Sequence, residues 1–363
     1  MRLKVGFISV YNTRCGIATY NEALLRELRK LCEVRIFAER NGEESSDNIR
    51  YCWNREKWPQ FQLIDEIDEY EPDIILFSHE YGIFSYKGAF QFTCLVSYLK
   101  WKKYKVYAIF HSIYGQHKDK SVQECCVPNV IVHSEKAKEA LVSKGITHND
   151  IHVLTHGIDY LTEDKMLLKS LWNTWGCPTI FQAGFGYPYK NFMGMLDIFK
   201  KVLEKYPNAH YVAQMSVSSK CSEENERYYE QVMNRAKELD LLHHVTINKG
   251  FISMDALLSF IRTSTVTVYP YIQDPQHAVM GATGAVRIPL VTETPIIVSD
   301  VNLFDDLKDV VLVGKDDDEI VKHICDVFSG NFDYEASNKK RIQFINDTCW
   351  AQAAKNLYSL FQQ

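Results

Sequence analysis

The 363-residue sequence lacks the features that mark several large classes of protein. It has no apolar run of about 18 residues, which excludes a transmembrane helix. Its N-terminus, MRLKVGFISV, passes directly into a strand pattern, so we expect no signal peptide. The ten cysteines form no C-x-x-C pair and no paired zinc spacing, so we expect reduced thiols in a cytoplasmic protein. With no low-complexity tract and 46% hydrophobic residues, the composition is that of an ordinary globular protein, long enough for two domains.

Two further absences concern binding sites. No G-x-G-x-x-G follows the first predicted strand, which disfavours a dinucleotide oxidoreductase. His148, His152 and His156 are spaced four residues apart, which would gather them for a metal only on a helix. Because Ile151–Leu154 is predicted to be a strand, the three rings should spread apart, and we expect no metal site.

Buried-strand patterns alternate with helix patterns along the whole chain. This alternation predicts an α/β protein with parallel, doubly wound sheets. We expect two Rossmann-like domains, residues 1–165 and 166–345, facing one another across a cleft, and a last helix in 346–363 that could pack back on the first domain. The predicted strands are Lys4–Val10, Glu33–Ala38, Asp73–Ser78, Lys105–His111, Pro128–Ser134, Thr179–Ala183, His210–Gln214, His244–Ile247, Thr265–Tyr269, Ile296–Val298 and Val310–Val313.

The stretch Tyr269–Asp300 is predicted to carry an anion site. Its small-residue turn, Gly281–Ala285, precedes a predicted helix at Val286–Thr292. Free backbone N–H groups and the helix dipole favour an anion at such a place, usually a phosphate. The alternative is a tight turn between packed elements.

Ligands of doubly wound sheets sit outside the carboxyl ends of the strands. The polar and glycine-containing loops at those ends should therefore line the cleft between the domains. These loops are Thr13–Gly16, His79–Phe84, His111–Tyr114, Thr155–Asp159, Gly184–Lys190 and Tyr271–Gly284.

Seven short segments, in this order, resemble motifs of the family 4 glycosyltransferases, which adopt the two-domain GT-B fold. Each motif is short and their order makes them specific, over roughly residues 4 to 310. The segments are Thr13–Tyr20 (TRCGIATY), His79–Phe84 (HEYGIF), Phe110–Ser112 (FHS), Val130–Ser134 (VIVHS), His156–Asp159 (HGID), Tyr189–Asn191 (YKN) and Pro295–Asp300 (PIIVSD).

The resemblance implies a retaining, metal-independent glycosyltransferase that uses a nucleoside-diphosphate sugar, UDP-linked in our expectation, and no other cofactor. The chain departs from the family at two points. Met280 and Ile288 stand where two glutamates eight residues apart are usual, and the arginine that usually precedes the lysine corresponding to Lys190 is missing. Two interpretations follow: a subgroup that holds the donor differently, or a scaffold that has lost catalysis and only binds nucleotide sugars.

Lys190 and Arg287 are the predicted diphosphate cations, because a departing diphosphate needs positive charge and backbone amides. The alternatives are a solvated lysine and a structural ion pair. The other predicted donor-binding residues are Gly16, Gly184, Thr283, Gly284 and Ala285. Asp316–Asp318 form a D-x-D triplet, which we interpret as a helix cap and not as a metal site.

His111 and Glu80 are the predicted catalytic residues. The resemblance implies that His111 contacts the transferred sugar, and Glu80 or His79 could orient or deprotonate the acceptor hydroxyl. Tyr81 and His156 complete the predicted acceptor side, although His156 suits a structural role better.

A lysine-rich segment leaves the acceptor open. Residues 81–148 hold ten lysines, no arginine and four acidic residues in a chain of net charge −5. The segment could be a solvated face, or Lys100–Lys105 could contact an anionic surface. We expect a glycan or lipid-linked saccharide acceptor and a cytoplasmic enzyme, peripheral at the inner membrane face if that contact forms. The alternative acceptor is a hydroxymethylated base in DNA.

Overall fold

The computed structural model of the protein describes residues 2–13, 15–84, 90–114, 121–146, 150–159, 176–216, 222–273 and 279–363, with the backbone alone at residues 121, 122, 222 and 279. It divides into two compact units. Unit 1 contains Met1–Gly157, Pro275–Ala282 and Thr348–Gln363, and unit 2 contains Ile158–Asp274 and Thr283–Asp347. The predicted boundary between residues 165 and 166 lies outside the described residues.

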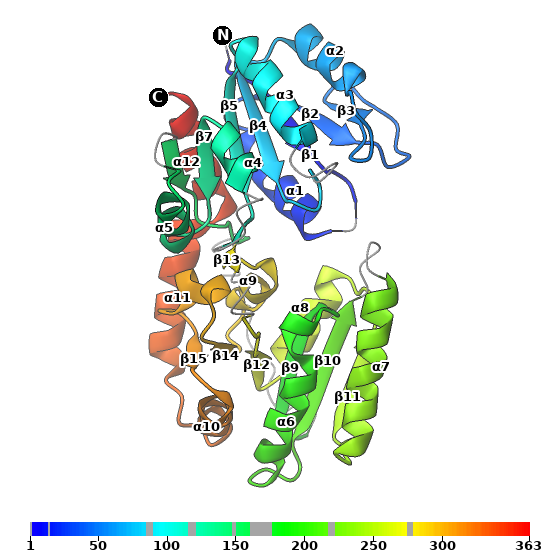
Figure 1. The fold of residues 1–363 in the computed structure, drawn as a ribbon. Coiled ribbons are helices and arrows are strands. Elements are labelled where there is room, and N and C mark those ends of the chain that lie inside the picture. The colour runs from blue at the N-terminus through cyan, green and yellow to red at the C-terminus, as the bar shows by residue number, and fades with distance from the viewer. Residues whose placement is uncertain are drawn as a thin grey trace. The chain divides into compact units, whose positions relative to one another are not determined.

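Unit 1 is built on a parallel sheet of seven strands in the order β3-β2-β1-β4-β5-β7-β8 (Figure 1). All six residues of β4 are buried, as expected for a parallel strand covered by helices on both faces. The predicted strands of this half are confirmed, and β3 was missed. The strands are β1 (Lys4–Ser9), β2 (Glu33–Glu39), β3 (Ile49–Trp53), β4 (Ile74–His79), β5 (Lys105–Phe110), β7 (Asn129–Val132) and β8 (Asp150–Val153).

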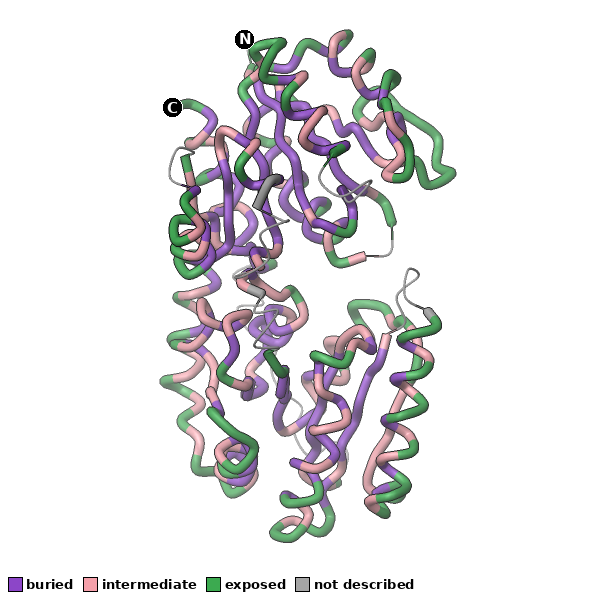
Figure 2. Tube along the Cα trace, viewed as in Figure 1, coloured by how far each residue is buried: buried purple, intermediate pink, exposed green. Residues whose placement is uncertain are grey.

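Within the described residues, six helices belong to unit 1, and the last of them lies near the end of the sequence. The helix α12 packs against α1, and its Trp350, Ala354 and Leu357 share a buried core with Leu24 and Leu28 of α1. The central strands β1 and β4 of the sheet are buried along nearly their whole length (Figure 2). The helices are α1 (Gly16–Leu28), α2 (Phe61–Tyr70), α3 (Phe90–Trp101), α4 (Ser121–Cys126), α5 (Glu135–Ser143) and α12 (Trp350–Phe361).

An antiparallel ribbon in unit 1 was not predicted. It pairs β6 (Ser112–Tyr114) with β13 (Val279–Gly281), so that Gly281 lies opposite Ser112. A Cβ atom at Gly281 would lie 2.4 Å from the His111 carbonyl oxygen, so only glycine fits this approach. The chain thus adds a strand to unit 1 before it returns to unit 2 at Thr283, and the Gly281–Ala285 turn begins inside this strand.

Unit 2 is built on a parallel sheet of six strands in the order β11-β10-β9-β12-β14-β15. The sequence predicted all six. They are β9 (Thr179–Phe185), β10 (His210–Ser216), β11 (Val245–Lys249), β12 (Val266–Tyr269), β14 (Ile296–Ser299) and β15 (Leu312–Gly314). The α-helices are α6 (Phe192–Leu203), α7 (Ser222–Glu238), α8 (Met254–Thr263), α9 (Gly284–Leu290), α10 (Asp317–Phe328) and α11 (Tyr334–Thr348), with 3-10 turns at Pro188–Lys190 and Asn302–Leu307.

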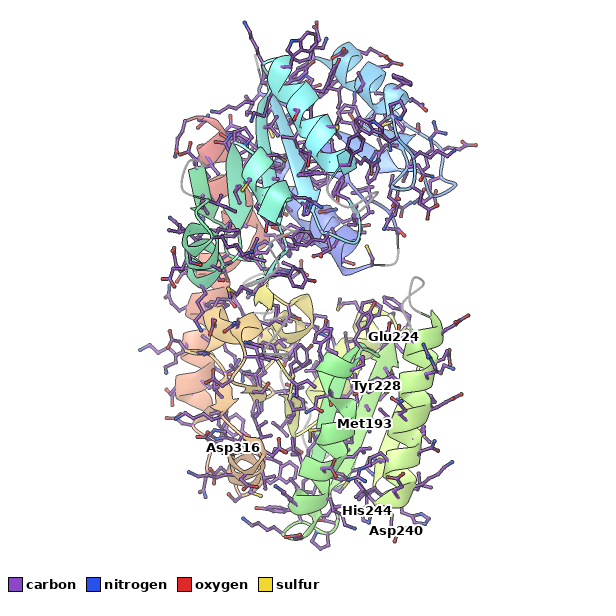
Figure 3. The ribbon with its side chains drawn as sticks, viewed as in Figure 1. Met193, Glu224, Tyr228, Asp240, His244 and Asp316 are labelled. Carbon is purple, nitrogen blue, oxygen red and sulfur yellow. The ribbon has the colours of Figure 1, made fainter. Side chains whose placement is uncertain are left out.

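Two side chains of unit 2 form hydrogen bonds with the backbone at the start of a helix. Tyr228 of α7 accepts a hydrogen bond from the Met193 backbone at the start of α6, at 3.4 Å (Figure 3). Asp316 caps α10 by accepting from the Glu319 backbone N–H at 2.8 Å. The acidic triplet therefore begins a helix, as predicted.

Candidate active site

Both sheets have a point at which the strand order reverses, and the predicted site residues follow those strands. In unit 2 the reversal lies between β9 and β12, so the loops after Phe185 and Tyr269 leave the sheet side by side. In unit 1 it lies between β1 and β4, and the following loops carry Gly16 and Glu80. Such reversal points are where doubly wound sheets bind ligands.

Lys190 is buried at the reversal point of unit 2, with 5% of its surface exposed. Its ammonium lies 3.9 Å from the centre of the Tyr271 ring and 4.9 Å from that of Tyr189, and it donates a hydrogen bond to the Tyr271 hydroxyl. Burial lowers the pKa of Lys190 to about 7. None of its described contacts is a carboxylate.

Neighbouring groups fix Lys190 in this position. Gln182 of β9 donates to the Lys190 carbonyl at 2.8 Å, and its own amide oxygen accepts from the Tyr211 hydroxyl at 2.6 Å. Gly184 lies against the Lys190 stem, since a Cβ atom there would be 3.7 Å from the lysine Cδ and Cε. Asn191 then caps α6 by accepting from the Gly194 backbone at 3.1 Å.

The Thr283–Ala285 segment adjoins Lys190 through Tyr271. Burial raises the pKa of Tyr271, and a hydrogen bond with Thr283 acts in the opposite direction. Thr283 is the N-cap of α9, and Gly284 and Ala285 form its first turn. The structure therefore brings Gly184, Lys190 and Thr283 together, with Tyr271 between them.

Arg287 is also buried, but its contacts are structural. Its guanidinium pairs with Asp306 and donates to the Thr283 carbonyl at 3.0 Å. Burial raises the pKa of Asp306, and the smaller effect of Arg287 lowers it. This geometry favours the alternative of a structural ion pair, in which Arg287 holds the Thr283 carbonyl in place.

The two positions of the missing glutamates hold apolar packing groups. Met280 is on β13 opposite Ile113 and packs against the core of unit 1. Ile288 is on α9 and packs against a core cluster of unit 2 that includes Phe181 and Ile261. Neither side chain can replace a carboxylate.

The α1 helix of unit 1 begins beside open space. Cys15 is its N-cap and accepts from the Ala18 backbone at 3.4 Å. A Cβ atom at Gly16 would meet nothing within 4 Å. The packing of unit 1 therefore does not require glycine here, and the close approach of a ligand stays a prediction.

Glu80 follows β4 and is held by two hydrogen bonds. One carboxylate oxygen accepts from the Ser112 hydroxyl at 2.8 Å, and the other accepts from the Tyr81 backbone at 3.0 Å. Glu80 is half-buried. It is thus a carboxylate held in place at the carboxyl edge of the sheet, as a group that orients a hydroxyl would need.

His79 and Tyr81 are buried, and both contact α4. The His79 Nε2–H donates to the Gln123 amide oxygen at 2.5 Å, and the Tyr81 hydroxyl donates to Glu124 at 2.5 Å. Burial lowers the pKa of His79 to about 3, so the ring is neutral. The His79 Nε2 and the Tyr81 hydroxyl face α4, which favours a supporting role over the predicted contact with the acceptor.

Both ring nitrogens of His111 are engaged within unit 1. Nε2 lies 2.8 Å from the Ser78 hydroxyl and Nδ1 lies 3.2 Å from His133 Nε2. His133 Nδ1 donates to the Leu154 carbonyl at 2.8 Å. Burial, and then the neighbouring His133, lower the pKa of His111 well below its ordinary value. A sugar contact by the imidazole would have to replace one of these hydrogen bonds.

His156 is the next-to-last residue of the first stretch of unit 1 and packs against aromatic rings of the same unit. It donates from Nδ1 to the Gly157 carbonyl at 2.8 Å, and its ring lies 5.0 Å from Tyr20 and 5.2 Å from Trp350. These contacts suit the structural role. His152 lies on β8, so the four-residue spacing is not helical there, and His148 lies outside the described residues. The described residues hold no group of three His, Cys, Asp or Glu placed to bind a metal.

Comparisons with known proteins agree with this arrangement. Residues 15–160 match the model of the family described as Glycosyltransferase Family 4. No curated protein matches the chain. Three solved structures align with nearly all of it.

The first is a sucrose-phosphate synthase from Thermosynechococcus elongatus, 15% identical with a TM-score of 0.73, covering 100% of this chain and 99% of that one. The second is a UDP-forming α,α-trehalose-phosphate synthase from Burkholderia xenovorans in complex with glucose-6-phosphate, 8% identical with a TM-score of 0.75, covering 99% and 100%. The third is a trehalose-6-phosphate synthase studied for glycosyl transfer with retention, 11% identical with a TM-score of 0.75, covering 99% of each chain.

The chain is a GT-B glycosyltransferase. The predicted fold class, the resemblance and the enzyme class are confirmed by the family match and by the two parallel sheets.

The lysine-rich segment of this glycosyltransferase is partly neutralised. Lys102 pairs with Asp68 at 2.9 Å, and Lys100 donates to the Cys126 carbonyl at 3.4 Å. Nothing in these contacts indicates an anionic partner, so that contact stays a prediction. None of the helices within the described residues is long and apolar enough to cross a membrane.

Sequence reasoning missed several residues that support the site. Tyr271 was within the Tyr271–Gly284 loop but was not singled out, although its place directly after β12 was a usable signal. Gln123 and Glu124 gave no signal, because only the fold brings α4 to the end of β4.

Proposed function

We propose that this protein is a retaining, metal-independent glycosyltransferase that transfers a sugar from a UDP-sugar to a saccharide hydroxyl. Unit 2 binds the donor diphosphate, and Lys190 is its cation. Lys190 carries the proposal, because it is a buried ammonium that contacts aromatic rings and a phenol.

A buried charge is costly unless it is paired. Cation–π contacts of this kind contribute about 0.5–2 kcal/mol, which is less than a buried ion pair with an anion provides. A diphosphate would supply the opposite charge, and the amides of the first turn of α9 would add hydrogen bonds. Because Lys190 already supplies a cation for the leaving diphosphate, the proposal needs no metal.

The comparisons support the remaining details of the donor chemistry. One similar protein is described as UDP-forming, and another was studied for transfer with retention. These are properties of those proteins, and we extend them to this chain as part of the proposal.

Glu80 is the proposed group at the acceptor hydroxyl, since its carboxylate is fixed by Ser112 and stays partly exposed. We propose a glycan or a lipid-linked saccharide as acceptor. Glucose-6-phosphate belongs in the same panel, because it is bound to one similar structure. DNA with hydroxymethylated bases tests the rival acceptor.

The test is a transfer assay with UDP-, GDP- and ADP-sugars, with and without EDTA. We expect turnover with a UDP-sugar, unchanged by EDTA, and a product whose anomeric configuration matches the donor. Lys190→Ala should lower kcat/KM by a factor that corresponds to about 2–4 kcal/mol of transition-state stabilisation, the cost of losing one preorganised charge contact. Lys201→Ala, which removes an exposed ion pair with Asp318 in the same unit, is the matched control. Full activity of Lys190→Ala would refute the donor assignment, and no reaction with any donor would favour a non-catalytic binding protein.

A further inference from the structure

The short helix α4 holds both neighbours of Glu80. His79 and Tyr81, the residues on either side of Glu80 in sequence, contact two consecutive residues of α4. All four of these partners are buried, and His79 and Glu124 have no exposed surface. The predicted catalytic carboxylate is therefore flanked by two anchored residues.

Further contacts close the turn around the same point. Gln123, whose amide oxygen accepts from His79, also donates from its amide nitrogen to the Phe84 carbonyl at 3.5 Å. The Ile83 backbone donates to the Glu80 carbonyl at 2.8 Å. The amide oxygen and the amide nitrogen of Gln123 thus hold the two ends of the turn that begins at His79 and ends at Phe84.

The carboxylate of Glu124 has its own partners at this site. The ammonium of Lys144, the C-cap residue of α5, lies 4.0 Å from the Glu124 carboxylate, and the Tyr81 hydroxyl donates to the same oxygen. A buried carboxylate is stable only with such partners. The arrangement is costly if it only fills the core, where apolar side chains would serve as well.

We propose that Gln123 and Glu124 are positioning residues that act through His79 and Tyr81 to fix the carboxylate of Glu80 for the acceptor hydroxyl. The inference rests on the proposed function of Glu80. A misplacement of about 1 Å can cost a reacting group about 100-fold in rate. Two anchors on consecutive residues of one helix would prevent this displacement, with Ser112 holding the carboxylate itself.

The test is a double-mutant cycle on turnover between Tyr81→Phe and Glu80→Gln, using the donor and acceptor found in the panel. Tyr81→Phe should lower kcat about tenfold and leave the KM for the UDP-sugar unchanged, because the donor binds in unit 2. In the Glu80→Gln background it should lower kcat no further, since its effect passes through Glu80. Glu124→Gln should behave like Tyr81→Phe.

Tyr98→Phe is the matched control, because Tyr98 also donates from a phenol to a carboxylate in unit 1, that of Asp68 at 3.2 Å. It should leave kcat unchanged. Independent effects that multiply in the Glu80→Gln background would overturn the positioning role while leaving the proposed function intact. Wild-type turnover of Glu80→Gln itself would instead refute the role of Glu80.

Hydrogen exchange supplies a readout that does not depend on activity. The amides of residues 79–84 should exchange at least tenfold faster in Tyr81→Phe than in the wild type, whereas Tyr98→Phe should not change them. Unaltered exchange in Tyr81→Phe would also refute the inference, because the turn would then keep its position without its anchor.

Discussion

Binding of UDP should draw a proton onto Lys190. In the free protein, burial lowers the pKa of this lysine to about 7. A diphosphate beside the ammonium favours its charged form and should return the pKa to about 10.5 or above. Binding and protonation are therefore linked.

The size of the effect follows from these two pKa values. At pH 8 a lysine of pKa about 7 is about one-tenth protonated, so binding should take up about 0.9 proton per site, and at pH 7 about 0.5. UDP contributes little at pH 8, because a phosphate monoester loses its second proton near pH 6. The affinity for UDP should then be about fivefold higher at pH 7 than at pH 8.

The direction of the pKa shift of Lys190 can be checked from the pH dependence of stability in the free protein. A lysine whose folded pKa is depressed leaves the unfolded chain with more bound protons between about pH 7 and 10.5, so stability should rise with pH across that window. Saturating ligand should cancel this trend, because it returns the pKa of Lys190 to about its unfolded value.

Calorimetric titration of UDP at pH 8 measures the uptake directly. Buffers with different ionisation enthalpies give different apparent heats, and the slope is the number of protons taken up. The matched variant is Lys190→Arg, which keeps a cation that is always protonated. It should bind UDP with no uptake. A wild-type uptake near zero, or an equal uptake in Lys190→Arg, would refute the reasoning.

Three other predictions concern stability. The neutral, buried His79 and His111 should make the protein acid-labile. Because their folded pKa values are depressed, the stability present above about pH 6.5 is lost as the pH falls, by about 3 kcal/mol in total between pH 6.5 and pH 5. Equal urea midpoints at pH 6.5 and 5 would contradict this. Gly157→Ala should cost about 1–3 kcal/mol, because a Cβ atom would lie 2.2 Å from the Trp350 ring. A thermal melt measures this cost, and Trp350→Leu in the same chain should recover part of it. Arg287→Ala should cost about 3–5 kcal/mol by leaving the largely buried carboxylate of Asp306 without its guanidinium partner. If denaturant unfolding showed no loss for Arg287→Ala, the structural ion pair would be the wrong interpretation.

The fold was predictable because it depends on local patterns. Buried parallel strands such as β4 are continuous apolar runs, and amphipathic helices such as α6 have a clear period. The strand β3 was missed because it has only five residues and the charged Arg50 interrupts its apolar pattern. The ribbon of β6 and β13 was missed because each strand has three residues and its partner lies far away in sequence.

The site was predictable only as far as strand order allows. Loops at the ends of strands pointed to Glu80 and Lys190, since the edge of a parallel sheet is a local consequence of chain direction. The roles of Arg287, His79 and Tyr81 depend on what each side chain meets, which is set by tertiary packing. Arg287 meets Asp306 and Tyr81 meets Glu124, and neither partner is near in sequence.

The passage of the chain between the units has a consequence for engineering. Unit 1 is assembled from three separate stretches of sequence, because β13 and α12 come from beyond residue 270. A fragment ending at Gly157 would expose the face of α1 that α12 covers and the edge of β6 that β13 covers. An exchange of donor specificity between enzymes of this type would therefore require a chimera with matched cuts at several points, since no single cut separates one unit from the other.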